Sequence, residues 1–386
     1  MRYLLMPCTV YTGTEVLPDH AVLINGERIE AVLPASGELP AEVPRRDGRG
    51  LHLCPGFVDL QIYGGGGVLF SVEPTPAVLA RLRAHTLRHG TTSFMPCLPT
   101  SPPALMAQAL ATVQAALPTM PGLLGLHLEG PYINPLKKGA HQAEFIQTPT
   151  PQAIDELLTA AAGALRLMTL APERVSPPVV ARLRAAGVVL SAGHSAATYE
   201  EASAAFEQGV STTTHLFNAM SGFESRAPGL VGAVYDAAQV QASIIADGVH
   251  CAYAALRISQ KILGERLFLI TDAVENSTYG AYRFHQQGDY FVDENGTLAG
   301  SALTMLTAVR NCVQHVGLPL PEALRMASLY PARVIGLANE IGRIAPGYRA
   351  DMCLFDDDYQ AHATIISGEF HAYSAAPHAY SAVPTA

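Results

Sequence analysis

Short apolar segments alternate with longer stretches of helical periodicity through the central part of the chain. Most of these segments are predominantly apolar, the pattern of strands that are buried on both faces. Eight such segments lie at residues 57–62, 92–97, 123–128, 165–170, 188–192, 211–215, 242–246 and 267–271. Helical patterns fill most of the gaps, at residues 76–89, 102–117, 153–162, 177–186 and 197–208. Eight strand–helix units predict an α/β protein with a (β/α)8 barrel of the TIM type rather than a doubly wound sheet.

The two ends of the chain differ, because apolar and polar residues alternate there between turns. Asn25 and Gly26 separate two alternating runs, and this pair is a strong signal for a β-hairpin. A similar pattern returns after residue 341 and leads into an apolar run at 352–355. We therefore expect a small β-sandwich domain formed from both termini, residues 1–53 and 343–386, around a barrel domain at 54–342.

The segment between the eighth predicted strand and the C-terminal pattern adds elements outside the eight units. Two short apolar runs at 282–284 and 290–292, followed by a turn at 293–296, predict a hairpin. Helical patterns at 302–315 and 321–335 predict two helices after it.

Composition and charge narrow the class of protein. Of 386 residues, 49% are hydrophobic and 15% are charged, as in a well-buried globular protein. The net charge of −9 argues against a nucleic-acid partner, although a few local cations can still bind a small anion. Six cysteines without a CxxC pair predict reduced thiols, and no apolar run reaches the ~18 residues of a membrane span. We expect a cytoplasmic protein without a membrane partner.

Metal-binding residue types follow three of the predicted strands. Glu129 follows the third strand, His194 the fifth and His215 the sixth. The carboxyl ends of barrel strands meet at one rim, so these side chains are expected to lie close together. Two imidazoles and a carboxylate suit Zn²⁺ or Fe²⁺ and leave a coordination position open for water. The pattern predicts a metal-dependent hydrolase.

Asp272 follows the eighth strand, which adjoins the first where a barrel closes. A carboxylate there can take a proton from water and later return it to a leaving group. A helix N-cap and a fourth metal ligand are the alternatives, and the spacing alone leaves all three open.

Several loops carry weaker signals for anion binding. The glycines at 64–67 lack the Lys-Ser/Thr pair of a P-loop, which favours a tight loop with close backbone approach over a phosphate cradle. Lys137 and Lys138 can attract an anion, although paired lysines in loops are usually solvated. Arg226 and His250 follow the sixth and seventh strands, where barrels often bind phosphate, and together they predict an anion clamp.

Seven short motifs together resemble the N-acetylglucosamine-6-phosphate deacetylases, a branch of the amidohydrolase superfamily. They occur in that family's order and extend over the chain from residue 55 to residue 351. They are FVDLQ at 57–61, LHLEGPY at 126–132, KKGAH at 137–141, SAGHS at 191–195, THLFNAM at 214–220, ADGVH at 246–250 and TDA at 271–273.

The resemblance implies removal of the acetyl group from N-acetyl-D-glucosamine 6-phosphate, in amino-sugar catabolism or recycling, by a homodimeric enzyme. It implies one metal ion held by Glu129, His194 and His215, with Asp272 as the catalytic acid/base. His141 matches a residue that contacts the substrate and polarises the acetamide carbonyl. The implied substrate contacts, with a neighbouring subunit completing the phosphate site, are Ala140, His141, Asn218, Ala219, Arg226, His250, Leu298, Ala299 and Gly300.

One departure bears on the number of metal ions. Many amidohydrolases carry His-x-His at the end of the first strand, and these residues supply a second metal. The matching positions here are Gln61 and Tyr63. Glutamine is a poor ligand and tyrosine an uncommon one, so we expect a single divalent ion per subunit.

Three alternatives compete with this interpretation. A cyclic amidase of the dihydroorotase kind, or an adenine-deaminase-like enzyme, usually needs the His-x-His pair that is missing here. A deacetylase for the galactosamine epimer is a closer alternative, because the two substrates differ at one hydroxyl group, and an enzyme distinguishes that group by only one or two contacts. A non-catalytic regulator that binds a sugar phosphate would have no use for Glu129, His194, His215 and Asp272 as a set.

Overall fold

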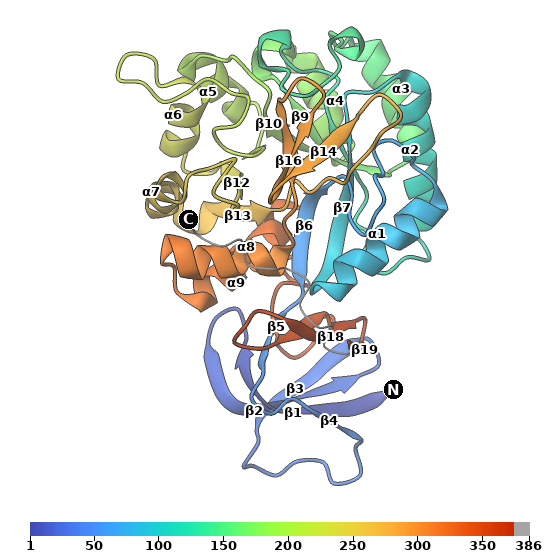
Figure 1. Ribbon diagram of the computed structural model, residues 1–386, viewed down its shortest axis with the longest axis vertical. Helices are drawn as coiled ribbons and strands as arrows, with labels where there is room; N and C mark the ends of the chain where they lie inside the picture. The colour runs from blue at the N-terminus through green and yellow to red at the C-terminus, as the bar shows by residue number, and fades with distance from the viewer. Residues whose placement is uncertain (374–386) are drawn as a thin grey trace.

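The computed structural model describes residues 1–373, so the last part of the predicted small domain, residues 374–386, lies outside the described residues. Figure 1 shows a barrel surrounded by helices and, at one end of it, a smaller body of strands that holds the N-terminus. Among the described residues, no helix is both long and apolar enough to cross a membrane.

Eight parallel strands form the barrel, as the apolar segments predict. Neighbours in sequence are neighbours in the sheet, from β6 to β13. The barrel closes where Asp272 N donates to Gln61 O at 3.0 Å and Ile62 pairs in parallel with Ala273. The strands are β6 (Phe57–Ile62), β7 (Thr91–Pro99), β8 (Leu126–Glu129), β9 (Leu165–Leu170), β10 (Val189–Ala192), β11 (Thr212–Thr213), β12 (Gln241–Ile245) and β13 (Leu267–Ile270).

Helices follow the strands and cover the outside of the barrel (Figure 1). Five match the predicted helical patterns, and α6 and α7 were not predicted. The helices are α1 (Pro76–Arg88), α2 (Pro103–Ala116), α3 (Pro151–Ala161), α4 (Pro177–Ala185), α5 (Tyr199–Glu207), α6 (Gly229–Asp236) and α7 (Tyr253–Leu263).

The segment after β13 forms a small antiparallel sheet and further helices. The predicted hairpin is present as β14 (Phe284–Gln287) and β15 (Tyr290–Asp293), with β16 (Leu298–Ser301) as an unpredicted third strand. The first predicted helix is α8 (Met305–Asn311), continued by a π-helical turn, Cys312–Val316.

The second predicted helix is interrupted. It consists of α9 (Leu320–Ala327) and α10 (Leu329–Val334), with Ser328 between them at φ −134°. Pro331 explains the break, because proline has no N–H to donate to the carbonyl four residues earlier and its ring crowds that carbonyl. A single helix over 321–335 was therefore wrong in its continuity, although both parts are helical.

The small domain is one sheet made from both ends of the chain. The hairpin predicted at Asn25 and Gly26 joins β2 to β3, and β5 pairs with β17, which links the termini. Side chains of β1, β2, β5, β17 and β18 share one apolar core. The strands are β1 (Arg2–Tyr11), β2 (Val16–Asn25), β3 (Arg28–Pro34), β4 (Arg45–Asp47), β5 (His52–Pro55), β17 (Met352–Phe355), β18 (Ala361–Ile366) and β19 (Glu369–Ala372).

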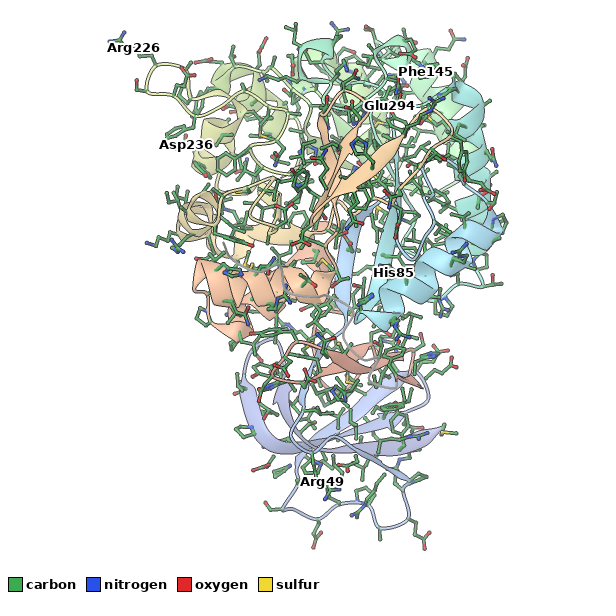
Figure 2. All side chains as sticks on the ribbon, viewed as in Figure 1. Arg49, His85, Phe145, Arg226, Asp236 and Glu294 are labelled. Atoms are coloured by element: carbon green, nitrogen blue, oxygen red, sulfur yellow. The ribbon has the colours of Figure 1, made fainter. Side chains whose placement is uncertain are left out.

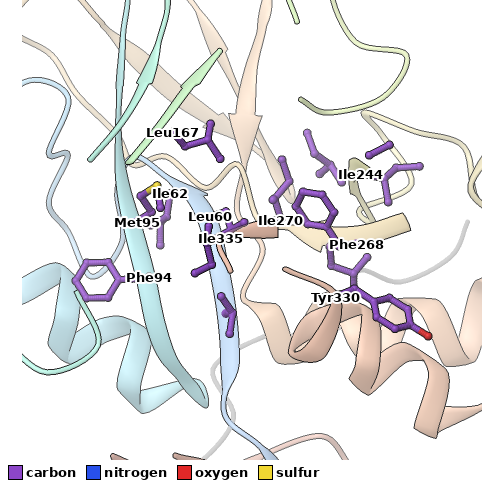
Figure 3. Packing of buried hydrophobic residues seen from close by; sticks show 14 of the residues in the cluster. Leu60, Ile62, Phe94, Met95, Leu167, Ile244, Phe268, Ile270, Tyr330 and Ile335 are labelled. Atoms are coloured by element: carbon purple, nitrogen blue, oxygen red, sulfur yellow. The ribbon is translucent and has the colours of Figure 1, made fainter. Parts of the chain in front are cut away.

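The main core lies between the barrel strands and the surrounding helices. Figure 3 shows Leu60 of β6, Phe268 of β13 and Tyr330 of α10 in this layer. Tyr330 and Phe268 are each at most 2% exposed. Each side chain of this size contributes roughly 2–3 kcal/mol through its burial, so this layer holds the strand ends at fixed positions.

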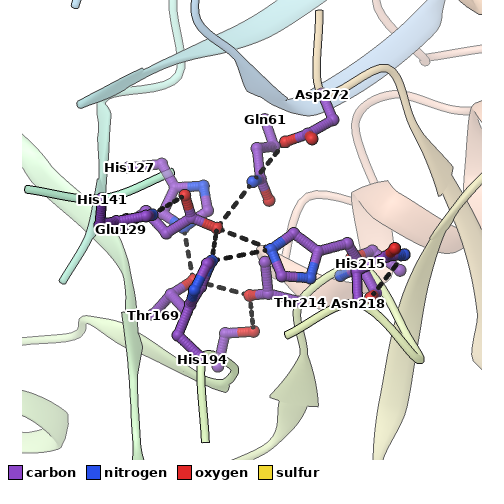
Figure 4. A network of polar contacts seen from close by, with 12 residues as sticks. Gln61, His127, Glu129, His141, Thr169, His194, Thr214, His215, Asn218 and Asp272 are labelled. Atoms are coloured by element: carbon purple, nitrogen blue, oxygen red, sulfur yellow. Dashed lines mark hydrogen bonds and ion pairs between the residues drawn. The ribbon is translucent and has the colours of Figure 1, made fainter. Parts of the chain in front are cut away.

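The inside of the barrel is polar, unlike its outside. His127 Nε2 lies 2.7 Å from Thr169 Oγ1, which lies 2.6 Å from Thr214 Oγ1. Ser191 Oγ lies 2.5 Å from the same Thr214 oxygen. These hydrogen bonds, drawn in Figure 4, join strands β8, β9 and β10 to the segment after β11, and they form the floor on which the candidate site lies.

Asp59, on β6, is a buried carboxyl group in this interior. It is 1% exposed and accepts hydrogen bonds from Thr271 Oγ1 at 2.5 Å and Gln61 N at 3.2 Å. Burial raises the pKa of Asp59 to about 6. The folded state therefore favours the neutral acid, and this stabilisation, full below about pH 4, is lost as the pH rises through about 6.

Asp59→Asn removes that titration. Between pH 4 and pH 7, the free energy of unfolding of the wild type should fall by about 2 kcal/mol more than that of Asp59→Asn. Urea unfolding of both proteins at the two pH values measures the difference. An identical pH dependence in both proteins would contradict the assignment.

Candidate active site

Three chemistry-bearing side chains follow strands in a backbone conformation that is rare outside glycine. His194, His215 and Asp272 have φ values of 48°, 34° and 54°. Each lies two residues beyond its strand, β10, β11 or β13, and Glu129 is the last residue of β8. These turns place the side chains at the carboxyl ends of the strands, where barrel active sites lie.

The three predicted ligands converge on one point. Glu129 Oε1 lies 2.9 Å from His215 Nε2 and 3.3 Å from His194 Nε2. The two Nε2 atoms are 3.2 Å apart, and all three residues are at most 5% exposed. Figure 4 shows both imidazoles pointing at the carboxylate. The set predicted from strand ends is therefore assembled in the folded chain.

A backbone carbonyl fixes the orientation of His194. His194 Nδ1 lies 2.8 Å from Lys137 O, and a carbonyl can only accept, so Nδ1 carries the hydrogen. When the ring is neutral, its Nε2 lone pair therefore faces Glu129, which is the arrangement that a metal-binding histidine needs. Lys137 ends a short 3-10 turn, Pro135–Lys137, so the loop after β8 orients a side chain that follows β10.

Glu129 is ionised in spite of its burial. Burial alone raises the pKa of a carboxyl group, but the charge of His194 and hydrogen bonds from His141, His194 and His215 outweigh it, and the pKa of Glu129 is well below its usual value. An anionic oxygen and two imidazole nitrogens within 3.3 Å of one another form a donor set that fits a divalent cation.

His141 lies on the other side of Glu129, with its Nε2 3.0 Å from Glu129 Oε2. Glu129, His141 and His194 are also close enough to bind one ion, so two three-residue sets share Glu129 and His194. The backbone N–H of Thr100 donates to His141 Nδ1 at 3.2 Å. The Thr100 hydroxyl also lies 2.9 Å from Nδ1, and Glu129 Oε2, an anionic acceptor, faces Nε2. With Nδ1 accepting and the hydrogen on Nε2, the neutral ring is a hydrogen-bond donor into the site.

Burial also keeps His141 neutral, because it lowers the pKa of His141 to about 4. Asp272 shows the opposite shift. Burial, together with the negative charge of Glu129, raises the pKa of the Asp272 carboxyl well above its usual value. A neutral donor and a carboxyl group that binds protons readily thus lie in the same cavity, which is the pairing that general acid–base chemistry uses.

Gln61 and Tyr63 have a role that their sequence positions did not predict. Gln61 Nε2 lies 2.8 Å from Asp272 Oδ1 and 3.0 Å from Glu129 Oε1, so one amide group bridges two carboxyl groups (Figure 4). Tyr63 OH donates to Glu129 Oε2. The sequence signal for these residues was their match to the positions of the missing His-x-His pair.

A cavity of about 340 Å³ opens above these groups. It is also lined by five residues that were not among the predicted substrate contacts: Leu136, Lys137, Val274, Tyr282 and Phe284. The predicted substrate contacts that line this cavity are Ala140, His141, Asn218, Ala219, His250, Leu298 and Ala299.

Gly300 supports the cavity from behind rather than lining it. A Cβ atom there would lie 2.7 Å from Val274 Cγ1 and 2.8 Å from Asp272 O, so only glycine lets β16 pass this close to the backbone of Asp272. The backbone of the glycine loop at 64–67 also packs closely against a neighbouring side chain, since a Cβ on Gly65 would overlap the ring of His85. That loop makes no part of the cavity lining.

Arg226 is placed away from the cavity of its own chain. It is exposed, lies between Glu224 and Ala227, which pair with each other, and is not among the cavity-lining residues. Figure 2 shows it at the outer end of the loop before α6. Within one chain, therefore, the structure does not bring Arg226 and His250 together as a clamp.

Comparison with known proteins gives the family. The profile of the Amidohydrolase family matches residues 52–373, and that of the NagA composite domain matches residues 2–53. An N-acetylglucosamine-6-phosphate deacetylase of Haemophilus influenzae is 39% identical, with 96% of this chain and 99% of that protein covered. An N-acetylgalactosamine-6-phosphate deacetylase of Escherichia coli O157:H7 is 33% identical, with 97% of this chain and 100% of that protein covered.

A solved structure extends the match to three dimensions. The crystal structure of N-acetylglucosamine-6-phosphate deacetylase from Pasteurella multocida superimposes with a TM-score of 0.93 at 36% identity, over 97% of this chain and 100% of that chain. The predicted barrel, with its domain of terminal strands, is thus confirmed as a known architecture. The chain belongs to the amidohydrolase family.

Proposed function

We propose that this protein hydrolyses N-acetyl-D-glucosamine 6-phosphate to D-glucosamine 6-phosphate and acetate, in amino-sugar catabolism or recycling. One observation carries the proposal: Glu129, His194, His215 and Asp272 share a single cavity. The relatives that match nearly the whole chain are named for this reaction or for its galactosamine counterpart. Hydrolysis of an amide needs a group that activates water, a proton acceptor and a hydrogen-bond donor to the carbonyl oxygen. The cavity offers residues that could supply each of these.

Glu129, His194 and His215 would hold one divalent ion per subunit, and Zn²⁺ or Fe²⁺ fits this donor set best. When bound, such an ion lowers the pKa of water and polarises a carbonyl group. Gln61 and Tyr63 direct hydrogen bonds at Glu129 from the positions where a second pair of histidines would offer lone pairs. They therefore support a site for a single ion.

Asp272 is the proton carrier in this proposal. As water attacks the acetyl carbon, the Asp272 carboxylate accepts a proton, and its raised pKa favours that transfer. The neutral acid then gives the proton to the nitrogen as the C–N bond breaks, so acetate and the free amine leave. His141 Nε2–H donates to the carbonyl oxygen as negative charge develops on it, and such a donor contributes about 10²–10³ in rate.

We propose that the phosphate binds at His250 and the Asn218–Ala219 segment, with Ala140 and the Leu298–Gly300 strand beside the sugar. Arg226 would reach this site from the other subunit of a homodimer. Its exposed place on the loop before α6, outside its own cavity, supports action on a neighbour. Phe223, on the same loop, is 64% exposed, as expected of an apolar residue that a second subunit covers.

Arg226→Ala is expected to raise KM for the phosphorylated substrate by about tenfold or more, with little change in kcat, because a charge-assisted contact to phosphate is worth about 1.5–3 kcal/mol. Steady-state kinetics of acetate release measure both constants.

The trans arrangement has its own test, in which Arg226→Ala and Asp272→Asn subunits are mixed and re-associated. Hybrid dimers contain one complete site, so part of the turnover should again show the wild-type KM; if only the raised KM of Arg226→Ala is seen, Arg226 acts in its own chain's site.

The substrate is tested by acetate release from three sugars: N-acetylglucosamine 6-phosphate, its galactosamine epimer and unphosphorylated N-acetylglucosamine. The proposal expects the first to give the highest kcat/KM and the third to be weak. Faster turnover of the epimer would support the galactosamine alternative. Tight binding of the sugar phosphates without acetate release would indicate a non-catalytic regulator.

We further propose that the protein works in a reducing, cytoplasmic setting, since its six cysteines are all buried and unpaired.

The domain division at residues 53/54 and 342/343 is likewise a proposal. It is supported by a second apolar core within the sheet of terminal strands, while Tyr11, Cys353 and Phe355 of those strands pack into the barrel core. Limited proteolysis that cut near those boundaries and left both cores intact would support it.

A further inference from the structure

Asp247 and His250, in the loop after β12, form a buried pair at one wall of the cavity. Asp247 Oδ2 lies 2.5 Å from His250 Nδ1. The other carboxylate oxygen, Oδ1, accepts the backbone N–H groups of Val249 at 2.9 Å and His250 at 2.8 Å. The side chains of Asp247 and His250 are 1% and 6% exposed. One carboxylate thus holds both the backbone and the ring of His250.

The turn that carries this pair is fixed by its neighbours. Gly248 has φ 79°, and a Cβ there would lie 2.8 Å from the ring of Tyr253, so the turn is packed against that ring. Asn311, on α8, donates to Ala246 O at 2.8 Å and anchors the residue before Asp247. His250 is therefore presented to the cavity by a rigid loop, with little conformational entropy left to lose on binding.

The hydrogen-bonding pattern determines what His250 can offer. An ionised Asp247 can only accept, so His250 Nδ1 carries a hydrogen, and Nε2 has no hydrogen-bond partner in residues 1–373. His250 lines the cavity. To bind a phosphate oxygen, Nε2 needs a hydrogen as well, and the carboxylate at Nδ1 and the phosphate at Nε2 both attract the positive charge that the ring then carries. The buried negative charge of Asp247 would otherwise repel an anion.

We propose that Asp247 is a positioning residue for substrate phosphate: it orients His250 so that Nε2 faces the phosphate, and its carboxylate lies against the ring that makes the hydrogen bond to the phosphate oxygen. The inference rests on the proposed function in that the substrate is a sugar phosphate. Asp247 itself does not touch the substrate, and its effect passes through His250.

The first test compares Asp247→Asn with the wild type. The variant should raise KM for N-acetylglucosamine 6-phosphate by about tenfold, the usual effect of reducing a charged hydrogen bond to a neutral one. KM for unphosphorylated N-acetylglucosamine should not change. Asp236→Asn, which removes a carboxylate from α6 outside the cavity lining, is the control and should leave both KM values unchanged. An equal increase in KM for both sugars would overturn the proposal.

A double-mutant cycle then tests whether Asp247 acts through His250. Asp247→Asn combined with His250→Asn should be no worse than His250→Asn alone, whereas additive losses would overturn the proposal.

Nitrogen-15 NMR of wild-type histidines with inorganic phosphate needs neither a variant nor turnover. With and without phosphate, the spectrum should show a hydrogen on His250 Nδ1, and with phosphate bound it should also show one on Nε2. An unprotonated Nδ1 would overturn the proposal. Absence of acetate release alongside this signature would contradict the proposed reaction and leave the Asp247–His250 pair standing.

Discussion

Asp272→Asn is expected to keep its metal ion and to lose about 10³–10⁴ in kcat, near the upper end of what general acid–base catalysis contributes. The substitution preserves the shape of the side chain, and its Oδ1 can still accept from Gln61 Nε2, which lies 2.8 Å away. It removes the ability to take a proton from water and return it to the amine. Stopped-time assays of acetate release measure the loss.

Metal content and thermal unfolding of Asp272→Asn serve as its controls. Because Glu129, His194 and His215 are unchanged, the bound metal per subunit should equal that of the wild type. Loss of the metal would identify Asp272 as a ligand, which is one of the alternatives left open by its position after β13. Wild-type turnover in the variant would remove Asp272 from the mechanism altogether.

His215→Asn and His141→Asn are expected to separate the two possible ligand sets. His215→Asn should lower the bound metal from about one equivalent to below a tenth and abolish turnover, because two protein ligands hold such an ion weakly. His141→Asn should keep the metal and lower kcat by about 10²–10³, the usual effect of losing one donor to the developing oxyanion. Metal analysis after dialysis, together with acetate release, measures both effects.

The tautomer of His141 is what separates these two outcomes. Its Nδ1 accepts from the backbone N–H of Thr100, so the neutral ring has a hydrogen on Nε2 and no lone pair there for an ion. The reverse result, metal lost in His141→Asn and kept in His215→Asn, would show that His141 is the third ligand.

The barrel strands were predictable because most of them are short, predominantly apolar segments that alternate with helical patterns, although several residues facing the barrel interior are polar. The helix α6 was harder to predict, because it has glycines at its first and fourth positions, which lower helix propensity. The helix α7 does show apolar residues at helical spacing, such as Leu256 and Leu263. This spacing indicates a helix, so α7 was predictable from the sequence.

The candidate ligands were predictable because barrel topology places strand ends side by side. Which nitrogen of each histidine faces the site was not predictable, since it depends on loops that pass nearby. Lys137 O orients His194, and the N–H of Thr100 orients His141. The bridging amide of Gln61 was missed for a related reason. The absence of the His-x-His pair indicates that a second metal ion is not bound there, but only the folded chain shows which groups the residues at those positions contact.

The measurement that tests the central claim most directly is acetate release from N-acetylglucosamine 6-phosphate by metal-stripped protein, repeated after Zn²⁺, Fe²⁺ or Mn²⁺ is added back. The proposed function predicts negligible release without metal and restored turnover with Zn²⁺ or Fe²⁺ at about one equivalent per subunit. Absence of turnover with every metal, in protein that has bound one equivalent, would contradict it and direct the search to another amidohydrolase substrate.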